Sequence, residues 1–314
     1  MWLVDKSKIL KNKYRLTFKD LAAEWLEIKK KEIKKSTYAN YTYAVEKYLL
    51  PEFKKCSLKK LEKYDFMELV DKLNKDYSPK TVRDILTKLK SILYYAQNEY
   101  EVNIKFNKII VPKLDAEPIT ILSKRERTRL VKNCIKQNTL KSLGIVVCLN
   151  TGLRIGEICA LKWENIDLDK REIRVRETLQ RVYYKQTRST KIIIDTPKSK
   201  KSVRNIPISD KLYEILKPLQ KSYEPNDFFL TGDSEKFIEP RNYQNAFKDL
   251  LKISQIKKIY KFHILRHTFS SNCIEVGMDV KSLSEILGHA TVEITLDKYV
   301  HSSYKNKKRF LERL

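Results

Sequence analysis

Hydrophobic residues recur every three to four positions through most of the chain, a spacing that predicts helices. In the first hundred residues this pattern predicts four helices. Ser36 is expected to cap the second helix, which Pro51 ends because proline disrupts a helix interior. The third helix should run from about Tyr64 to Leu73, and Ser78 should open the fourth.

After residue 167 apolar and polar residues begin to alternate, first over residues 173–176. Alternation with a period of two predicts β-strands, and further strands fit residues 179–185, 190–195 and 203–208. Helical spacing occupies the rest of this half, at about 124–137, 140–150, 209–221, 240–253, 263–276, 281–288 and 291–299. The predicted fold class is therefore mainly α with a small antiparallel β-sheet, or α+β.

A length of 314 residues allows two domains with cores of their own. Pro112 and Pro118 fall in a stretch without periodicity, which indicates a linker. The expected order is a lead-in, a four-helix domain, a linker, a second domain and a short basic helix, at residues 1–13, 14–104, 105–120, 121–302 and 303–314.

The chain is strongly basic, with 65 Lys and Arg residues against 39 Asp and Glu residues and a net charge of +26. Both halves carry the excess, so both domains could face one polyanion, and nucleic acid is the default partner. The alternatives are a ribosome-like protein, or a merely basic one whose lysines form a solvated face.

The five cysteines are widely spaced and form no CxxC pair, so we interpret them as buried thiols of a reducing compartment. Asp5 and the lysines near it argue against a signal peptide, and no apolar run is long enough to span a bilayer. The sequence predicts a cytoplasmic protein that does not contact membranes.

All four histidines of the chain lie in its last sixty or so residues, together with Arg266 and Tyr299. Such clustering indicates a site. The four-residue spacing of His263 and His267 would also suit zinc, but no HExxH glutamate accompanies them, so we expect no metal. His267 is interpreted as a packed structural residue and His301 as a solvated one.

Cleavage of a DNA phosphodiester requires fixed cations at the phosphate, an activated nucleophile and a proton for the leaving oxygen. Arginine suits the first task because its planar fork pairs with two oxygens and stays charged. The candidates are Arg154 and Arg266 as cations, Tyr299 as nucleophile, Lys198 as general acid, and His263 and His289 near the phosphate.

The order of these residues along the chain resembles that of the tyrosine recombinases, the phage-integrase family. The matching segments are Thr151-Gly152-Leu153-Arg154-Ile155-Gly156-Glu157, Lys198 in a hairpin, His263-x-x-Arg266-His267, Leu287-Gly288-His289 and Tyr299. The resemblance covers about residues 14–300. Within the family, the chain is similar to integrases of phages and integrative mobile elements.

The resemblance implies a SAM-like core-binding domain at 14–104 and a catalytic domain at 121–302. Arg154 and Arg266 would clamp the scissile phosphate, Lys198 would protonate the 5′-hydroxyl, and Tyr299 would form a 3′-phosphotyrosyl link. His263 and His289 would assist proton movement and phosphate binding, and Glu157 would support the site. No cofactor or metal would be needed.

The implied partners are double-stranded recombination sites, three further copies of the chain in a homotetramer on DNA, and an accessory DNA-bending or directionality factor. The helix at 303–314 would dock on a neighbouring subunit. Integration, excision and dimer resolution all stay open as biological roles.

Two rival functions stay open from the residues alone. A type IB topoisomerase, which has a similar active site, would relax supercoils as a monomer. A DNA-binding protein without catalysis would use the same basic faces. The general acid could also be Lys200 or Lys201 instead of Lys198, since all three lie in one turn. The target DNA sequence cannot be read from the chain.

Overall fold

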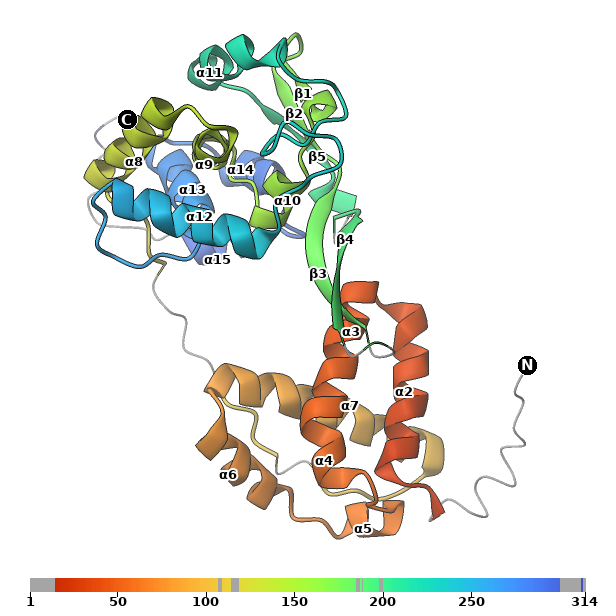
Figure 1. Cartoon of the computed structure of the whole chain (residues 1–314). Coiled ribbons are helices and arrows are strands. Elements are labelled where there is room, and N and C mark those ends of the chain that lie inside the picture. Colours follow the sequence, from red (N-terminus) through yellow and green to blue (C-terminus); the bar gives the residue numbers. More distant parts are fainter. Residues whose placement is uncertain are drawn as a thin grey trace. The chain divides into compact units, whose positions relative to one another are not determined.

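The computed structural model describes residues 15–106, 109–113, 119–184, 187, 189–197, 200–299 and 312. These residues form two compact units (Figure 1). The first lies within Met1–Glu117 and also takes in Arg181–Lys191, and the second lies within Pro118–Gln180 and Ile192–Leu314.

The first unit is built from helices at the spacing that the hydrophobic pattern predicts. A capping box at Thr17 starts the first of them, because the Thr17 side chain accepts from the Asp20 N–H and the Asp20 carboxylate accepts from the Thr17 N–H. The helical elements are α2 (Phe18–Glu32), α3 (Lys35–Ala44), the π-helical turn η2 (Val45–Leu49), α4 (Leu50–Phe53), α5 (Leu58–Glu62), α6 (Phe66–Asp76) and α7 (Pro79–Tyr100).

The second predicted helix differs from the expectation at both ends. It begins at Lys35 with Lys34 as the N-cap residue, and the buried Ser36 hydroxyl has no hydrogen-bond partner, so Ser36 is not the cap. Pro51 does not end it either, because η2 shifts the register and α4 follows with Pro51 in its first turn. A proline is tolerated there, where its missing N–H is not needed.

The core of the first unit is apolar and contains large side chains. Trp25 is buried and stacks on Tyr41, with ring centroids 5.3 Å apart and planes 3° from parallel. Phe106 and Ile109 are buried in the same core although they fall in the predicted linker, so this core extends past residue 104.

The second unit surrounds α9 (Leu140–Thr151), which is buried on nearly all sides. Helices α8, α12 and α13 pack directly against it. The elements are α8 (Lys124–Gln137), α9, α10 (Ile155–Ala160), η3 (Trp163–Asn165), β1 (Ile166–Asp167), β2 (Glu172–Val175), β3 (Thr178–Tyr184), β4 (Ser189–Asp195), η4 (Lys200–Ser202), β5 (Arg204–Pro207), α11 (Asp210–Gln220), α12 (Pro240–Ile253), α13 (Ile264–Glu275), α14 (Val280–Leu287) and α15 (Glu293–Tyr299).

Two small sheets complete the fold. One has the order β1-β2-β5 with antiparallel neighbours, and Ile173 of β2 pairs with Ile206 of β5. The other pairs β3 with β4. The predicted strands are confirmed, and so is the fold class of mainly α with a small antiparallel sheet. The hairpin expected around Lys198 is wrong, because β4 pairs with β3 and β5 pairs with β2, so the strands on either side of that residue belong to different sheets.

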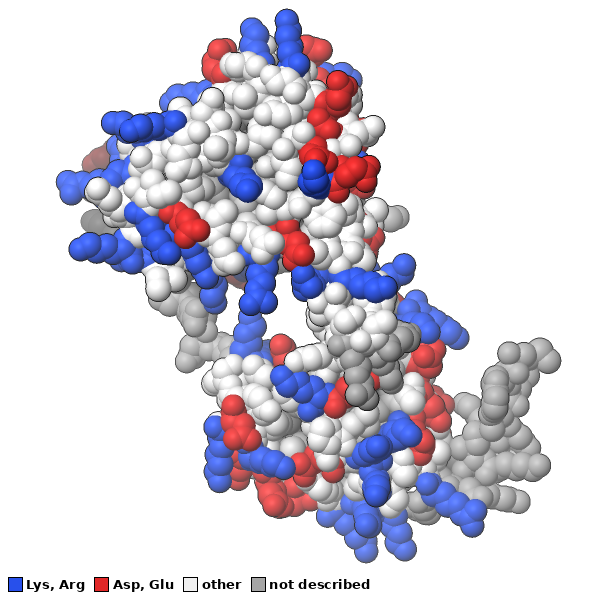
Figure 2. Space-filling view, viewed as in Figure 1, with Lys and Arg blue, Asp and Glu red and all other residues white. Residues whose placement is uncertain are grey.

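Basic side chains cover both units on the face that Figure 2 shows, with acidic groups among them. The basic coat predicted from the composition therefore lies at the surface, where a polyanion could reach it. All five cysteines carry free thiols; four are buried, and Cys56 is partly buried. In the described part of the chain, no helix is long and apolar enough to cross a membrane.

Gly152 ends α9 in the left-handed region, at φ +67°, with its N–H bonded to the Cys148 carbonyl. A Cβ atom there would lie 2.6 Å from the Phe269 ring and 2.9 Å from a Leu287 methyl carbon. We expect Gly152→Ala to lower the free energy of unfolding by about 2–5 kcal/mol, because overpacking adds to backbone strain.

Gly277→Ala is the matched control for that substitution. Gly277 also has a positive φ, +95°, but nothing lies within 4 Å of its Cβ position, so it carries only the backbone strain. Urea unfolding of both variants separates the two effects. Equal losses of stability would contradict the packing around Gly152.

Candidate active site

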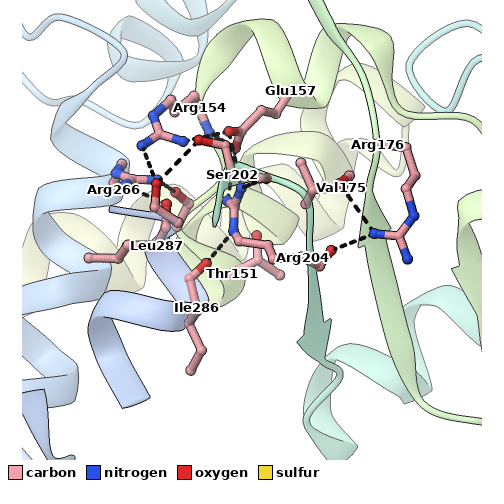
Figure 3. A network of polar contacts seen from close by, with 12 residues as sticks. Thr151, Arg154, Glu157, Val175, Arg176, Ser202, Arg204, Arg266, Ile286 and Leu287 are labelled. Atoms are coloured by element: carbon pink, nitrogen blue, oxygen red, sulfur yellow. Dashed lines mark hydrogen bonds and ion pairs between the residues drawn. The ribbon is translucent and has the colours of Figure 1, made fainter. Parts of the chain in front are cut away.

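The C-terminal end of α14 collects three arginines from three other parts of the second unit. The last turn of a helix leaves carbonyls without intrahelical partners, and its partial negative charge attracts cations. Here the carbonyls of three consecutive residues, Ile286, Leu287 and Gly288, accept from Arg204, Arg266 and Arg154 respectively (Figure 3).

Arg266 is the most deeply buried of the three, with 1% of its surface exposed. It lies on α13 and donates from Nη1 to the Gly152 carbonyl at 2.9 Å and from Nη2 to the Leu287 carbonyl at 2.8 Å. Burial lowers its pKa to about 9, and the charge of Arg154 lowers it too, so the guanidinium stays protonated at neutral pH.

Arg154 is placed by the turn that Gly152 makes possible. It is the N-cap residue of α10, and its N–H donates to the Glu157 carboxylate at 2.9 Å. Its Nη1 contacts the same carboxylate at 2.6 Å, and its Nη2 donates to the Gly288 carbonyl at 3.2 Å. Arg154 and Arg266 therefore flank one turn, although 112 positions separate them in the sequence.

Glu157 is the acidic centre of this network. Its carboxylate accepts from Arg204 Nη1 at 3.1 Å and Nη2 at 2.9 Å, with both side chains buried. Burial alone would raise the pKa of Glu157, but the charges and hydrogen bonds of Arg204 and Arg154 outweigh it and lower the pKa to about 2. Two guanidinium groups, those of Arg204 and Arg154, thus meet one carboxylate. The charge of Arg266 nearby makes three cations against one anion, an excess of positive charge suited to an anion.

Arg204 is not among the site residues predicted from the sequence, although the alternation of residues in β5 carries a signal for it. In β5 the inward positions are Arg204 and Ile206, and Ile206 is fully in the core. A charged residue that shares a strand face with core isoleucines must be paired when it is buried. Arg204 also donates to the Ser202 carbonyl at 3.0 Å, which ties β5 and η4 to the network.

A second cluster lies at α13 and α15. Tyr299 is buried at 6% exposure, and its Oη lies 2.8 Å from His267 Nδ1. His289 follows Gly288, which ends α14 at φ +63°, and its Nδ1 lies 2.7 Å from Thr295 Oγ1. The rings of His289 and Tyr299 are parallel within 2°, with centroids 6.5 Å apart.

Four of the six predicted residues are tied to this region by hydrogen bonds or ring contacts, namely Arg154, Arg266, His289 and Tyr299. His263 is exposed at the start of α13 and meets His267 edge-on, with ring centroids 4.6 Å apart. Lys198 and His301 lie outside the described residues. Lys201, from the same turn as Lys198, donates to the Ala290 carbonyl at 2.9 Å.

His289 and His267 are held in the neutral state. Burial lowers the pKa of His289 to about 3, and the charges of Arg266 and Arg154 act in the same direction. The pKa of His267 is also lowered, first by desolvation and then by the positive charges of Lys298 and Arg266. Burial raises the pKa of Tyr299, while a hydrogen bond to Ser270 and the charge of Arg266 oppose this.

Arginines fixed beside a buried tyrosine form a site that can hold a phosphate next to a nucleophile. Among the described residues, no group of three or more His, Cys, Asp or Glu side chains is arranged to hold a metal ion.

The chain belongs to the phage integrase family, whose profile matches residues 120–306. The profile of the phage integrase N-terminal SAM-like domain matches residues 17–74. A tyrosine recombinase described as XerC-like, from Caldanaerobacter subterraneus subsp. tengcongensis, is 30% identical over 262 residues, which cover 76% of this chain. The match spans 66% of that relative, slightly less than two thirds of its length.

Solved structures share the fold at low sequence identity. The Tn1549 transposon integrase in complex with transposon right end DNA gives a TM-score of 0.75 at 23% identity, covering 95% of this chain and 99% of that one. A lambda integrase tetramer bound to a Holliday junction gives 0.64 at 15% identity, covering 92% and 80%. The family and the fold expected from the motifs are therefore confirmed.

Arg204→Met should leave the buried Glu157 carboxylate short of a partner. Removing one member of a buried pair typically costs about 3–5 kcal/mol, and we expect a loss of unfolding free energy in that range. The control is Arg174→Met, which breaks the more exposed contacts of Arg174 with Asp167 and Glu172 and should cost much less. A comparable loss in both variants would contradict the network.

The neutral state of His289 predicts a pH dependence of stability. Its folded-state pKa lies below the ordinary value near 6.5, so the unfolded chain binds the proton first as the pH falls. The contribution of the neutral His289 to the free energy of unfolding is complete above about pH 6.5 and is lost as the pH falls toward 3. At pH 5 the loss is at most about 2 kcal/mol. Urea unfolding at pH 7 and pH 5 measures it, and His289→Gln should reduce the difference. If the stability difference between pH 7 and pH 5 were the same in His289→Gln as in the wild-type chain, His289 would not be its source.

Proposed function

We propose that this chain is a site-specific DNA recombinase that cuts and rejoins DNA through a covalent 3′-phosphotyrosyl intermediate. The observation that carries the proposal is the placement of Tyr299 beside His267 and His289, in a family member whose Arg154 and Arg266 are fixed on one turn. Positioning and fixed positive charge are what phosphoryl transfer requires of a protein.

Arg154 and Arg266 bind the non-bridging oxygens of the scissile phosphate. Their guanidinium groups are held by backbone carbonyls, so they need little reorganisation as charge develops on those oxygens. Glu157 holds Arg154 from the side and keeps Arg204 in the network. Its role in this proposal is to position the arginines.

Tyr299 attacks the phosphorus and releases the 5′-oxygen, which takes a proton from Lys198. His263 and His289 assist the proton transfers and contact the phosphate. The phosphotyrosine keeps the energy of the broken bond, so the 5′-hydroxyl of a second strand can reverse the step without ATP. The assignment of Lys198, in preference to Lys200 or Lys201, rests on its sequence context.

The proposed substrate is double-stranded DNA carrying a recombination site. The surface charge of the chain supports it, since a net charge of +26 favours a polyanion. We further propose that four copies assemble on two duplexes, that an accessory DNA-bending or directionality factor joins them, and that they act in the cytoplasm. The lambda integrase tetramer on a Holliday junction, which shares the fold, supports the assembly.

The relatives also bear on the biological role. The solved structure with a TM-score of 0.75 is the integrase of a transposon, Tn1549. We therefore propose that this chain moves a phage or an integrative element. Membership of the phage integrase family favours recombination over the two rivals, supercoil relaxation and binding without catalysis.

The test is capture of covalent protein–DNA adducts on fragmented DNA of the source genome. The wild-type chain should form adducts that survive denaturant, and Tyr299→Phe should form none while retaining the same DNA in a filter assay. The matched control is Tyr94→Phe, since Tyr94 is 60% exposed on α7 and should not affect adducts.

Sequencing of the captured fragments separates the rivals. A recombinase yields fragments that share one sequence, whereas a topoisomerase yields adducts without a common sequence. DNA retention without any adduct from the wild-type chain would identify a binding protein and refute the proposal.

A further inference from the structure

We propose that His267 is the catalytic base that takes the proton of Tyr299 as the phenol attacks the phosphate. The inference rests on the proposed function and assigns a step of it to a residue that the motif comparison leaves without a role. Geometry carries it. His267 Nδ1 lies 2.8 Å from Tyr299 Oη, within reach of a direct proton transfer.

The contact joins two helices at fixed positions. His267 is the fourth residue of α13, one residue after Arg266, and Tyr299 ends α15. Their ring centroids are 5.6 Å apart. The same helix that directs Arg266 at the phosphate site therefore directs His267 at the nucleophile, which aligns the base with the reaction.

The other described histidines are less suited to this step. His289 Nδ1 is engaged with Thr295 Oγ1 at 2.7 Å, and its ring lies parallel to that of Tyr299 with centroids 6.5 Å apart. His263 contacts the His267 ring edge-on. Among the described residues, His267 is the histidine whose ring nitrogen hydrogen bonds to the phenol oxygen, so His263 and His289 are left to the phosphate and to the other proton transfers.

The charges around His267 make its basicity depend on the substrate. The groups that face it are Arg266 and His263 on α13 and Lys298 and Tyr299 on α15. Burial and the positive charges of Lys298 and Arg266 lower its pKa, which keeps the imidazole neutral and able to accept a proton. A bound phosphodiester brings a negative charge between the arginines, which offsets those positive charges and favours the imidazolium.

The step balances without a further reactant. The Tyr299 Oη–H proton moves to His267 Nδ1 while the Oη–phosphorus bond forms and the phosphorus–O5′ bond breaks. The O5′ atom takes its proton from the general acid. In the rejoining step a 5′-hydroxyl attacks the phosphotyrosine, and the imidazolium returns the proton to Oη. The arrangement uses one histidine as base in cleavage and as acid in resealing.

The experiment measures the rate of adduct formation by His267→Asn, whose side-chain amide can hydrogen bond to the phenol but does not titrate near neutral pH. General-base catalysis contributes about 10²–10⁴-fold, so we expect the rate to fall about 100-fold or more. His267→Gln provides a second variant with a different reach. Urea unfolding and DNA retention confirm that each variant is folded and binds DNA.

A ring-fluorinated tyrosine at position 299, whose phenol ionises near neutral pH, then separates a base from a residue that only positions the phenol. Because this phenol needs no base, the loss in His267→Asn should shrink to about 10-fold or less. The comparison variant is His263→Asn, whose defect should be the same with either tyrosine. The rate of His267→Asn with natural tyrosine should also rise with pH as hydroxide takes over.

Three results would overturn the inference. The first is a wild-type rate of adduct formation in His267→Asn. The second is a faster rate in that variant, which would mean that the contact restrains the nucleophile. The third is an equal loss of rate with natural and fluorinated tyrosine, which would mean that His267 only positions the phenol. Each of these leaves the proposed function intact, because the wild-type chain still forms adducts. A wild-type chain that forms no adduct would overturn both.

Discussion

The candidate active site depends on how the backbone carbonyls at the end of α14 find hydrogen-bond donors. A helix C-terminus leaves carbonyls that need donors, and a buried arginine needs acceptors that do not cancel its charge. Both requirements are satisfied together, because Arg204, Arg266 and Arg154 donate to the carbonyls of residues 286, 287 and 288. The carbonyls fix the guanidinium planes while leaving the positive charge in place, which a set of carboxylates could not do.

Glu157 determines how much of that charge remains. Its one negative charge offsets one of the three guanidinium charges, and it contacts Arg204 and Arg154 while Arg266 is held by backbone carbonyls. Gly288 makes the arrangement possible sterically, because a Cβ there would lie 3.0 Å from Arg204 and 3.1 Å from the Lys201 carbonyl. The glycine, the carboxylate and the helix end therefore act as one unit.

Local patterns were sufficient for most of the fold and for the family. Period and capping residues located the helices, and the order of Arg154, Arg266, His289 and Tyr299 identified the family. What they could not supply were pairings across the fold. The bond between His267 and Tyr299 joins two helices 32 positions apart, and that between Arg204 and Glu157 spans 47. Near Pro51, a π-helical turn changes the register, an effect that spacing alone does not reveal.

The end of one short helix, α14, connects the three arginines with His289. Helix α14 has eight residues, and the carbonyls of its last two residues and of its C-cap Gly288 accept from three guanidinium groups. His289 follows Gly288, and its ring is parallel to that of Tyr299. Each of the three arginines is anchored to this backbone segment, and each also has a second acceptor elsewhere, Glu157 or the Gly152 carbonyl. A displacement of this helix end would therefore move the acceptors of all three guanidinium groups and the position of His289 together.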